Sequence, residues 1–178
     1  MALDFIGHSL GVDSRLLETN DKYNRNLPSK HVGQICKFLP DGATVAVLGL
    51  SYKPDTHVIE ESPGIYLCQA LGNAGFRVIG HDTLAASESE SVLRYKALVT
   101  NSLDEALINA HAIIVTTREP LYVELTTKQI TRNRNKTILF DFWRSFKHLI
   151  GEKRIKYVPI GLCGDEKKAA DQIKSLWG

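Results

Sequence analysis

Short apolar runs separated by longer amphipathic segments dominate the chain after residue 41. The runs are continuous and rich in β-branched residues, which is typical of strands covered on both faces of a parallel sheet. They predict strands at residues 44–50, 77–82, 97–100, 112–116, 137–141 and 156–160, and the segments between them predict helices at 63–75, 102–110 and 120–132. This alternation indicates an α/β fold, a Rossmann-like, doubly wound, mainly parallel sheet in a three-layer α/β/α arrangement.

The helix expected at 63–75 has the clearest end signals. Ser62 can cap its first turn, and Pro63 would occupy the first helical position, where its missing N–H costs nothing. Gly75 stands where a left-handed residue commonly ends a helix. An apolar series at helical spacing predicts the face that packs on the sheet: Ile65, Leu67, Cys68 and Leu71.

The region before the first strand, residues 13–39, has its apolar side chains at helical spacing. They are Leu16, Leu17, Tyr23, Leu27, Val32, Ile35 and Phe38. Pro28 interrupts this stripe, and because proline removes a backbone donor we expect a kink there or two helices. The turn-forming residues 40–42 end the lead-in. The predicted organisation is a helical segment at 1–40 and a Rossmann-like domain at 41–178.

Composition narrows the functional classes. The 178 residues include 22 Lys and Arg against 20 Asp and Glu, a net charge of +2, which argues against nucleic acid or a membrane surface as partner. The cysteines form no CxxC pair, which favours a reducing compartment. The N-terminus does not resemble a secretory signal, and no stretch approaches the roughly 20 apolar residues of a membrane span. We therefore expect a cytoplasmic location.

The loop at residues 49–62 is the best candidate for ligand chemistry. Ligands of doubly wound sheets collect at the carboxyl ends of the strands, and this loop would follow the first strand. It offers Gly49 for close backbone approach, Lys53 as a cation, and Asp55 and Thr56 as hydrogen-bonding groups. The G-x-G-x-x-G pattern of dinucleotide sites is absent. Lys53 could equally be a solvated lysine, and Asp55-Thr56 could form a turn or a cap.

The string from Val45 to Thr56, VAVLGLSYKPDT, followed by Glu61-Ser62-Pro63, is similar to the start of the C-terminal domain of UDP-glucose/GDP-mannose dehydrogenases. In that family a strand ending in Gly leads to Phe/Tyr-Lys, then Asp-Thr, then Arg-Glu-Ser. The resemblance continues at His81-Asp82, at residues 110–117, at residues 138–141 with Arg144, and upstream at residues 10–13, Leu16-Leu17 and Asn20. It covers nearly the whole chain and fades after about Gly161.

The resemblance implies a UDP- or GDP-sugar as ligand and a homodimer formed through the helical lead-in. It carries substrate binding over to Gly49, Tyr52, Lys53, Asp55, Thr56 and Arg144. Lys53 would neutralise a phosphate or hold the sugar, and the planar fork of Arg144 suits a diphosphate.

Two departures from the family pattern qualify these roles. Two residues separate Asp141 from Arg144 where many members have one, so a structural salt bridge is an equal alternative for Arg144. Glu60 stands where many members have an arginine that approaches the dinucleotide, and an acid there would repel a pyrophosphate.

The family oxidises a sugar C6 alcohol to a carboxylate by two hydride transfers to NAD, through a thioester on the cysteine of a Gly-Gly-x-Cys motif. This chain contains neither that motif nor the N-terminal NAD domain. Cys36 and Cys68 are expected to be core residues, and Cys163 lacks the context of a reactive thiol. We therefore assign no catalytic residue, expect no NAD binding by this chain alone, and predict no metal site from its scattered histidines.

Two functions remain. The chain could be the substrate-binding part of an NAD-dependent nucleotide-sugar 6-dehydrogenase of polysaccharide biosynthesis, inactive alone. Alternatively, it could be a stand-alone nucleotide-binding or regulatory module derived from that fold, because one fold serves many functions.

Overall fold

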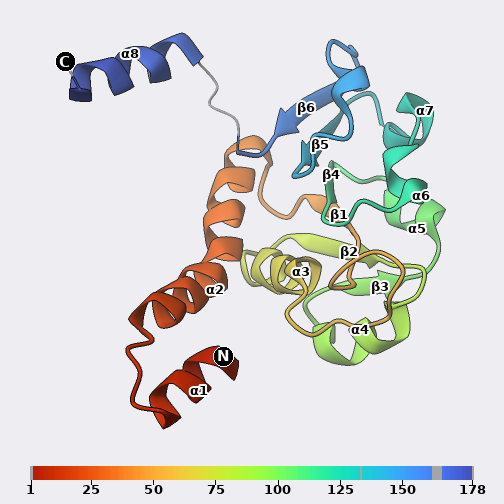
Figure 1. Cartoon of the computed structure of the whole chain (residues 1–178). Helices are drawn as coiled ribbons and strands as arrows, with labels where there is room; N and C mark the ends of the chain where they lie inside the picture. Colours follow the sequence, from red (N-terminus) through yellow and green to blue (C-terminus); the bar gives the residue numbers. More distant parts are fainter. Residues whose placement is uncertain (1, 133, 162–165, 178) are drawn as a thin grey trace.

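The computed structural model describes residues 2–132, 134–161 and 166–177. Its strands are β1 (Thr44–Leu48), β2 (Arg77–His81), β3 (Leu98–Thr100), β4 (Ala112–Val115), β5 (Thr137–Asp141) and β6 (Ile155–Pro159). They form one six-stranded parallel sheet in the order β3-β2-β1-β4-β5-β6. The strand order reverses next to β1, the arrangement of a Rossmann-like sheet (Figure 1). The predicted fold class and all six predicted strands are confirmed.

Helices cover both faces of the sheet. In chain order the helices of the described residues are α1 (Ala2–Ser9), α2 (Arg15–Ile35), α3 (Pro63–Asn73), α4 (Ala86–Leu93), α5 (Leu103–Leu107), α6 (Pro120–Val123), α7 (Thr127–Ile130) and α8 (Glu166–Trp177), with 3-10 turns η1 (Cys36–Phe38) and η2 (Lys147–Leu149). Buried residues of α2, α3 and α4 pack on one face of the sheet, and those of α5, α6 and α7 pack on the other. Along β1 the side chains alternate between these two cores, so the strand is buried on both faces.

The prediction of a single helix at 120–132 is wrong. Two four-residue helices, α6 and α7, occupy this region. α6 ends at Val123, and Thr126 caps the start of α7. Its hydroxyl accepts a hydrogen bond from the backbone N–H of Gln129, while the Gln129 side chain accepts one from the N–H of Thr126. This capping box fixes a new helix start inside the predicted one.

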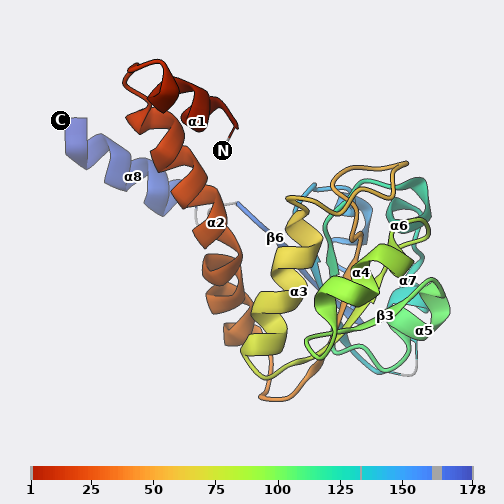
Figure 2. The same cartoon turned by 90° about the horizontal axis from the view of Figure 1, so that it is seen from below.

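The lead-in helix is continuous through its proline. α2 runs from Arg15 to Ile35 with Pro28 inside, so the alternative of two helices is wrong. Its C-terminal half is covered by α3, where Val32 and Ile35 are buried. Its N-terminal half and α1 extend away from the sheet (Figures 1 and 2). The predicted stripe is uncovered there, since Leu16 is 81% exposed and Tyr23 53% exposed.

The two described cysteines differ in burial. Cys68, a residue of α3, is buried as expected, and burial raises the pKa of its thiol. Cys36 is exposed, so its assignment to the core is wrong. The α-helix ends at Ile35 and a tighter 3-10 turn follows, which leaves Cys36 beside the buried stripe instead of on it. Cys163 lies outside the described residues. None of the described helices is both long and apolar enough to cross a membrane.

Candidate functional site

The loops that follow β1, β4 and β5 lie next to one another at the carboxyl edge of the sheet. Leu48 of β1 pairs with Val115 of β4, and Val115 pairs with Asp141 of β5. The loops that begin at Gly49, Thr116 and Phe142 are therefore adjacent in space. The candidate ligand loop at residues 49–62 lies here, and the topology brings the loop of Arg144 to the same edge two strands away.

The loop after β1 begins at Gly49, where neighbouring side chains leave no room for a Cβ atom. Gly49 has φ +102, and a Cβ built on it would meet the hydroxyls of both Thr116 and Thr117 closer than 3.0 Å. The hydroxyl of Thr116 donates to the carbonyl oxygens of Leu48 and Gly49. Gly49 therefore serves close backbone packing against β4, and only glycine fits there.

Asp82, directly after β2, accepts hydrogen bonds from backbone N–H groups of the loop after β1, the kind of donor that a dinucleotide phosphate would need. Its buried carboxylate accepts hydrogen bonds from the N–H groups of Leu50 (2.8 Å) and Ser51 (3.0 Å) on one oxygen and from Leu84 and Ala85 (both 2.9 Å) on the other. Burial acts to raise the pKa of Asp82, but these four donors lower it below its ordinary value.

The residues of this edge therefore do not fit NAD in the usual cradle after β1. Asp82 already takes the loop donors that would hold a pyrophosphate, and Ser62 accepts the N–H of Ile65 at the start of α3. Glu60 is exposed in the same loop, where its charge would oppose a pyrophosphate.

The loop's polar side chains divide into free groups and groups already engaged. Lys53 and Asp55 are exposed, and neither side chain has a hydrogen bond or ion pair within the described residues. The hydroxyl of Thr56 accepts a hydrogen bond from the N–H of Val58 at 3.2 Å. Of the roles considered for Asp55-Thr56, the turn is therefore present. Asp55 has φ +58, a left-handed conformation rare outside glycine that holds the loop in a defined shape.

The loop after β5 is organised by Asp141. This buried carboxylate accepts hydrogen bonds from the N–H groups of Trp143 (2.9 Å) and Phe146 (3.0 Å) and from the hydroxyl of Tyr157 (3.0 Å). Arg144 has φ +58 at the exposed tip of this loop. Its guanidinium makes no ion pair in the described structure, so the salt-bridge alternative for Arg144 is not supported.

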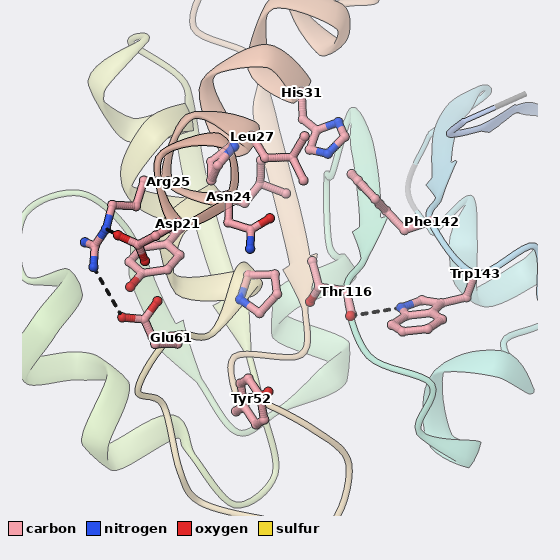
Figure 3. A pocket seen from close by; sticks show the side chains of 14 residues that line it. Asp21, Asn24, Arg25, Leu27, His31, Tyr52, Glu61, Thr116, Phe142 and Trp143 are labelled. Atoms are coloured by element: carbon pink, nitrogen blue, oxygen red, sulfur yellow. Dashed lines mark hydrogen bonds and ion pairs between the residues drawn. The ribbon is translucent and has the colours of Figure 1, made fainter. Parts of the chain in front are cut away.

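A cavity of about 510 Å³ lies between α2 and the loops of the carboxyl edge (Figure 3). Among the residues predicted to bind substrate, only Tyr52 lines it. The full lining is Asp21, Asn24, Arg25, Leu27, Pro28, His31, Tyr52, Glu61, Pro63, Tyr66, Leu67, Thr116, Phe142 and Trp143. The sequence predicted neither the α2 side of this cavity nor the role of Trp143, whose ring N–H donates to the carbonyl of Thr116 at 2.9 Å.

Glu119, just after β4, is an acid whose proton affinity is unusual. The residue is only 9% exposed. Burial, followed by the negative charges of Asp82 and Asp55, raises its pKa from 4.5 to about 7. Among the described residues its side chain has no hydrogen-bond partner. A carboxyl group with a raised pKa at this edge is typical of functional regions.

Glu119→Gln should stabilise the protein at high pH only. Because the folded pKa lies above the unfolded value, the folded state binds more protons between pH 4.5 and about 7, and its stability falls as the pH rises through that window. The amide removes this loss, so unfolding in urea should give a gain on the order of 1–3 kcal/mol at pH 8 and none at pH 4. Glu124→Gln, at an exposed position, is the control. A gain of equal size at both pH values would contradict the assignment.

No group of three or more His, Cys, Asp and Glu within the described residues is arranged to hold a metal ion. The candidate site, as far as the described residues show it, has two unpaired cations, Lys53 and Arg144, on loops beside a cavity with aromatic walls.

The chain is similar to known proteins over more than half of its length. The family model described as "UDP-glucose/GDP-mannose dehydrogenase family, UDP binding domain" matches residues 46–148, more than half of the chain. The UDP-glucose 6-dehydrogenase AglM of Haloferax volcanii is 37% identical over 109 residues, covering 60% of this chain and 25% of that protein. The UDP-glucose 6-dehydrogenase of Rickettsia conorii is 27% identical, covering 80% of this chain and 34% of that protein.

Solved structures resemble the same region. A UDP-glucose dehydrogenase from Pyrobaculum islandicum superposes with a TM-score of 0.62 at 26% identity, covering 79% of this chain and 31% of that one. A GDP-mannose dehydrogenase from Pseudomonas aeruginosa gives 0.66 at 19% identity, covering 88% and 36%, and this likeness shows the fold alone. The chain spans between a quarter and about a third of the length of these relatives. It belongs to the UDP-glucose/GDP-mannose dehydrogenase family, and residues 46–148 are its UDP-binding domain.

Proposed function

We propose that this chain binds the nucleotide end of a UDP- or GDP-sugar, as the substrate-binding part of an NAD-dependent nucleotide-sugar 6-dehydrogenase. The observation that supports the proposal is the pair of exposed, unpaired cations on two loops of the carboxyl edge, Lys53 and Arg144, both within the region that the family model matches. An ammonium and a guanidinium are suited to a diphosphate, and neither is neutralised by a carboxylate of the described structure. Asp55, whose left-handed backbone shapes the Lys53 loop, and Thr56 would position this loop.

Oxidation of the sugar needs groups beyond those found at this edge. Neither described cysteine lies in the three loops of the site, since Cys36 follows α2 and Cys68 is buried in α3. We therefore expect the chain alone to give no NAD reduction, which an absorbance assay with UDP-glucose and GDP-mannose would detect. In the whole enzyme, NAD would be held by residues other than those around Asp82.

A homodimer through the lead-in helices is part of the proposal, as is a cytoplasmic location. Large apolar side chains of α1 and the first half of α2 are exposed, including Phe5 (74%) and Leu16 (81%). The helical segment 1–40 would then serve assembly and residues 41–178 ligand binding. The regulatory-module alternative keeps one supporting observation, the acid Glu60 at the family's arginine position.

Lys53→Ala tests the proposal directly. Calorimetry with UDP, GDP and their sugar conjugates should show binding to the unaltered chain that weakens by about 1–3 kcal/mol in the variant, the range for losing a charged hydrogen bond. Lys136→Ala is a matched control, because Lys136 is exposed directly before β5, at the opposite edge of the sheet. Equal affinities for Lys53→Ala and the unaltered chain would remove the loop from the ligand site.

A further inference from the structure

The amino edge of the sheet is strongly positive. All six strands are parallel, so the segments that lead into them meet at this edge, opposite the loops that hold Lys53 and Arg144. The segments are residues 40–44, 74–77, 94–98, 108–112, 132–137 and 150–155. They contain eight lysines and arginines but only two acids, whereas the whole chain has a net charge of only +2. The positive charge of the protein is therefore concentrated at this edge.

Most of these cations are not neutralised. Within the described residues only Arg132 among the eight makes an ion pair, which joins it to Asp104. The side chain of Arg77, the first residue of β2, is exposed and has neither a hydrogen bond nor an ion pair there. Arg134, before β5, also has no ion pair, and its Nε is buried without a hydrogen-bond partner. Because a buried donor without an acceptor is costly, the Arg134 guanidinium has an unmade hydrogen bond that an acceptor at this edge would satisfy.

His111 lies between these two arginines. Its N–H donates to the carbonyl of Thr44 (2.8 Å) and its carbonyl accepts from the N–H of Ile138 (3.0 Å), so the residue is joined to both neighbouring strands. Its ring Nδ1 accepts the N–H of Thr44 at 3.1 Å, which places the proton of the neutral ring on Nε2. Nε2 has no acceptor among the described residues, so this N–H is an open donor. Burial, followed by the positive charges of Arg134 and Arg77, lowers the pKa of His111.

The segment that carries Arg134 is held in place by its neighbour. The guanidinium of Arg154, before β6, donates to the carbonyl of Arg134 at 2.7 Å and to that of Thr131 at 3.3 Å. The N–H of Thr137 donates in turn to the carbonyl of Arg154 at 3.0 Å. Donors that are fixed before a ligand arrives lose little conformational freedom when it binds.

We propose that Arg77, His111 and Arg134 form a binding site for a short chain of phosphate groups. Guanidinium groups donate paired hydrogen bonds to phosphate oxygens, and the imidazole N–H adds a further donor. Neighbouring strands are about 4.8 Å apart, so Arg77 and His111, two strands apart, are separated by about 10 Å at the backbone. Several phosphates in a row span this distance better than one. Both a nucleoside triphosphate and inorganic polyphosphate supply such a chain, and the site is independent of the nucleotide-sugar site proposed above.

Calorimetry at low salt with inorganic triphosphate tests this site. Binding to the unaltered chain should weaken about 10-fold in Arg77→Ala, the loss expected for one charged hydrogen bond. Arg118→Ala is the matched control, because Arg118 is an exposed arginine after β4, at the carboxyl edge, without a partner among the described residues. ATP should bind as well. An affinity for ATP above that for triphosphate would identify a nucleotide as the source of the phosphates, and equal affinities would identify the phosphate chain alone.

His111 gives a local readout of the bound anion. Proton NMR follows the titration of each imidazole ring, and His111→Gln identifies the signal of His111. Bound phosphates would neutralise the neighbouring arginines, so the pKa of His111 should rise in the presence of triphosphate. His57, in the loop after β1, reports on the carboxyl edge. A change in the His57 signal alone, or a loss of triphosphate binding in Lys53→Ala, would place the anion at that edge and contradict the proposal.

Arg134→Ala should weaken triphosphate binding to an extent similar to Arg77→Ala. Thermal unfolding followed by circular dichroism checks that each variant is folded, and if Arg134→Ala is not, Arg77→Ala and the His111 titration still decide. Equal losses in Arg77→Ala and Arg118→Ala would show attraction by net charge only, and an unchanged affinity in Arg77→Ala would likewise overturn the site. Tighter binding of duplex DNA than of triphosphate would assign the amino edge to nucleic acid instead.

Discussion

Gly64→Ala should lower the free energy of unfolding by about 3 kcal/mol, the upper part of the usual range for overpacking a core. Gly64 lies in the first turn of α3, where a Cβ would meet the carbonyl oxygen of Gly49 closer than 3.0 Å and the carbonyl carbon at 3.1 Å. Both obstacles are backbone atoms, so neither can turn aside as a flexible side chain would. The helix would have to move away from the end of β1, opening the core beneath Leu67 and Cys68.

The matched control is Gly33→Ala in α2. No atom lies within 4 Å of a Cβ built on Gly33, so the same substitution there should only improve helix propensity, by about 0.5–1 kcal/mol in the stabilising direction. Urea unfolding at neutral pH would measure both. The decisive result is that the free energy of unfolding falls in Gly64→Ala and rises in Gly33→Ala. A Gly64→Ala variant as stable as the unaltered protein would mean that α3 does not pack against the Gly49 backbone.

The sheet could be predicted from the sequence because its strands are buried on both faces. Continuous apolar runs such as residues 112–116 leave few alternative structures, and the observed strands fall within about two residues of the predicted limits. The broken helix at 120–132 was missed although its signal was present. Thr126 and Gln129 have the spacing of a capping box, which marks a helix start even within a longer amphipathic segment.

The position of the candidate loop also followed from the sequence, whereas its surroundings did not. A loop after the first strand of such a sheet must lie at the carboxyl edge, so Lys53 could be placed from topology alone. The cavity joins Asn24 to Trp143, which are more than a hundred positions apart. No local pattern indicates which part of α2 overhangs the sheet edge. The two residues between Asp141 and Arg144 depart from the family spacing, but only the fold shows that both of them, Phe142 and Trp143, line the cavity.

Asp82 could be predicted to end a strand, yet its role depended on contacts that only the fold provides. In a doubly wound sheet an acid at this position is close to the loop after the first strand. Here it binds that loop itself, through the N–H groups of Leu50 and Ser51. The carboxylate thus replaces the anion that the loop would otherwise attract, and it fixes the segment that presents Tyr52 and Lys53.

Asp82→Asn should therefore destabilise the protein by about 3–5 kcal/mol at pH 7, since it removes a buried charge that satisfies four backbone donors and turns an amide N–H₂ toward some of them. The folded pKa of Asp82 lies below its unfolded value of 3.8, so this contribution is complete above about pH 4 and is lost as the pH falls through the folded pKa. Urea unfolding at pH 7 and at pH 3 should show the difference between the variant and the unaltered protein narrowing at the lower pH. Asp41→Asn, at an exposed turn before β1, should change stability by less than about 0.5 kcal/mol. Faster hydrogen exchange at the amides of Leu50 and Ser51 would locate the effect in the ligand loop, whereas unchanged exchange and stability would show that Asp82 does not hold it.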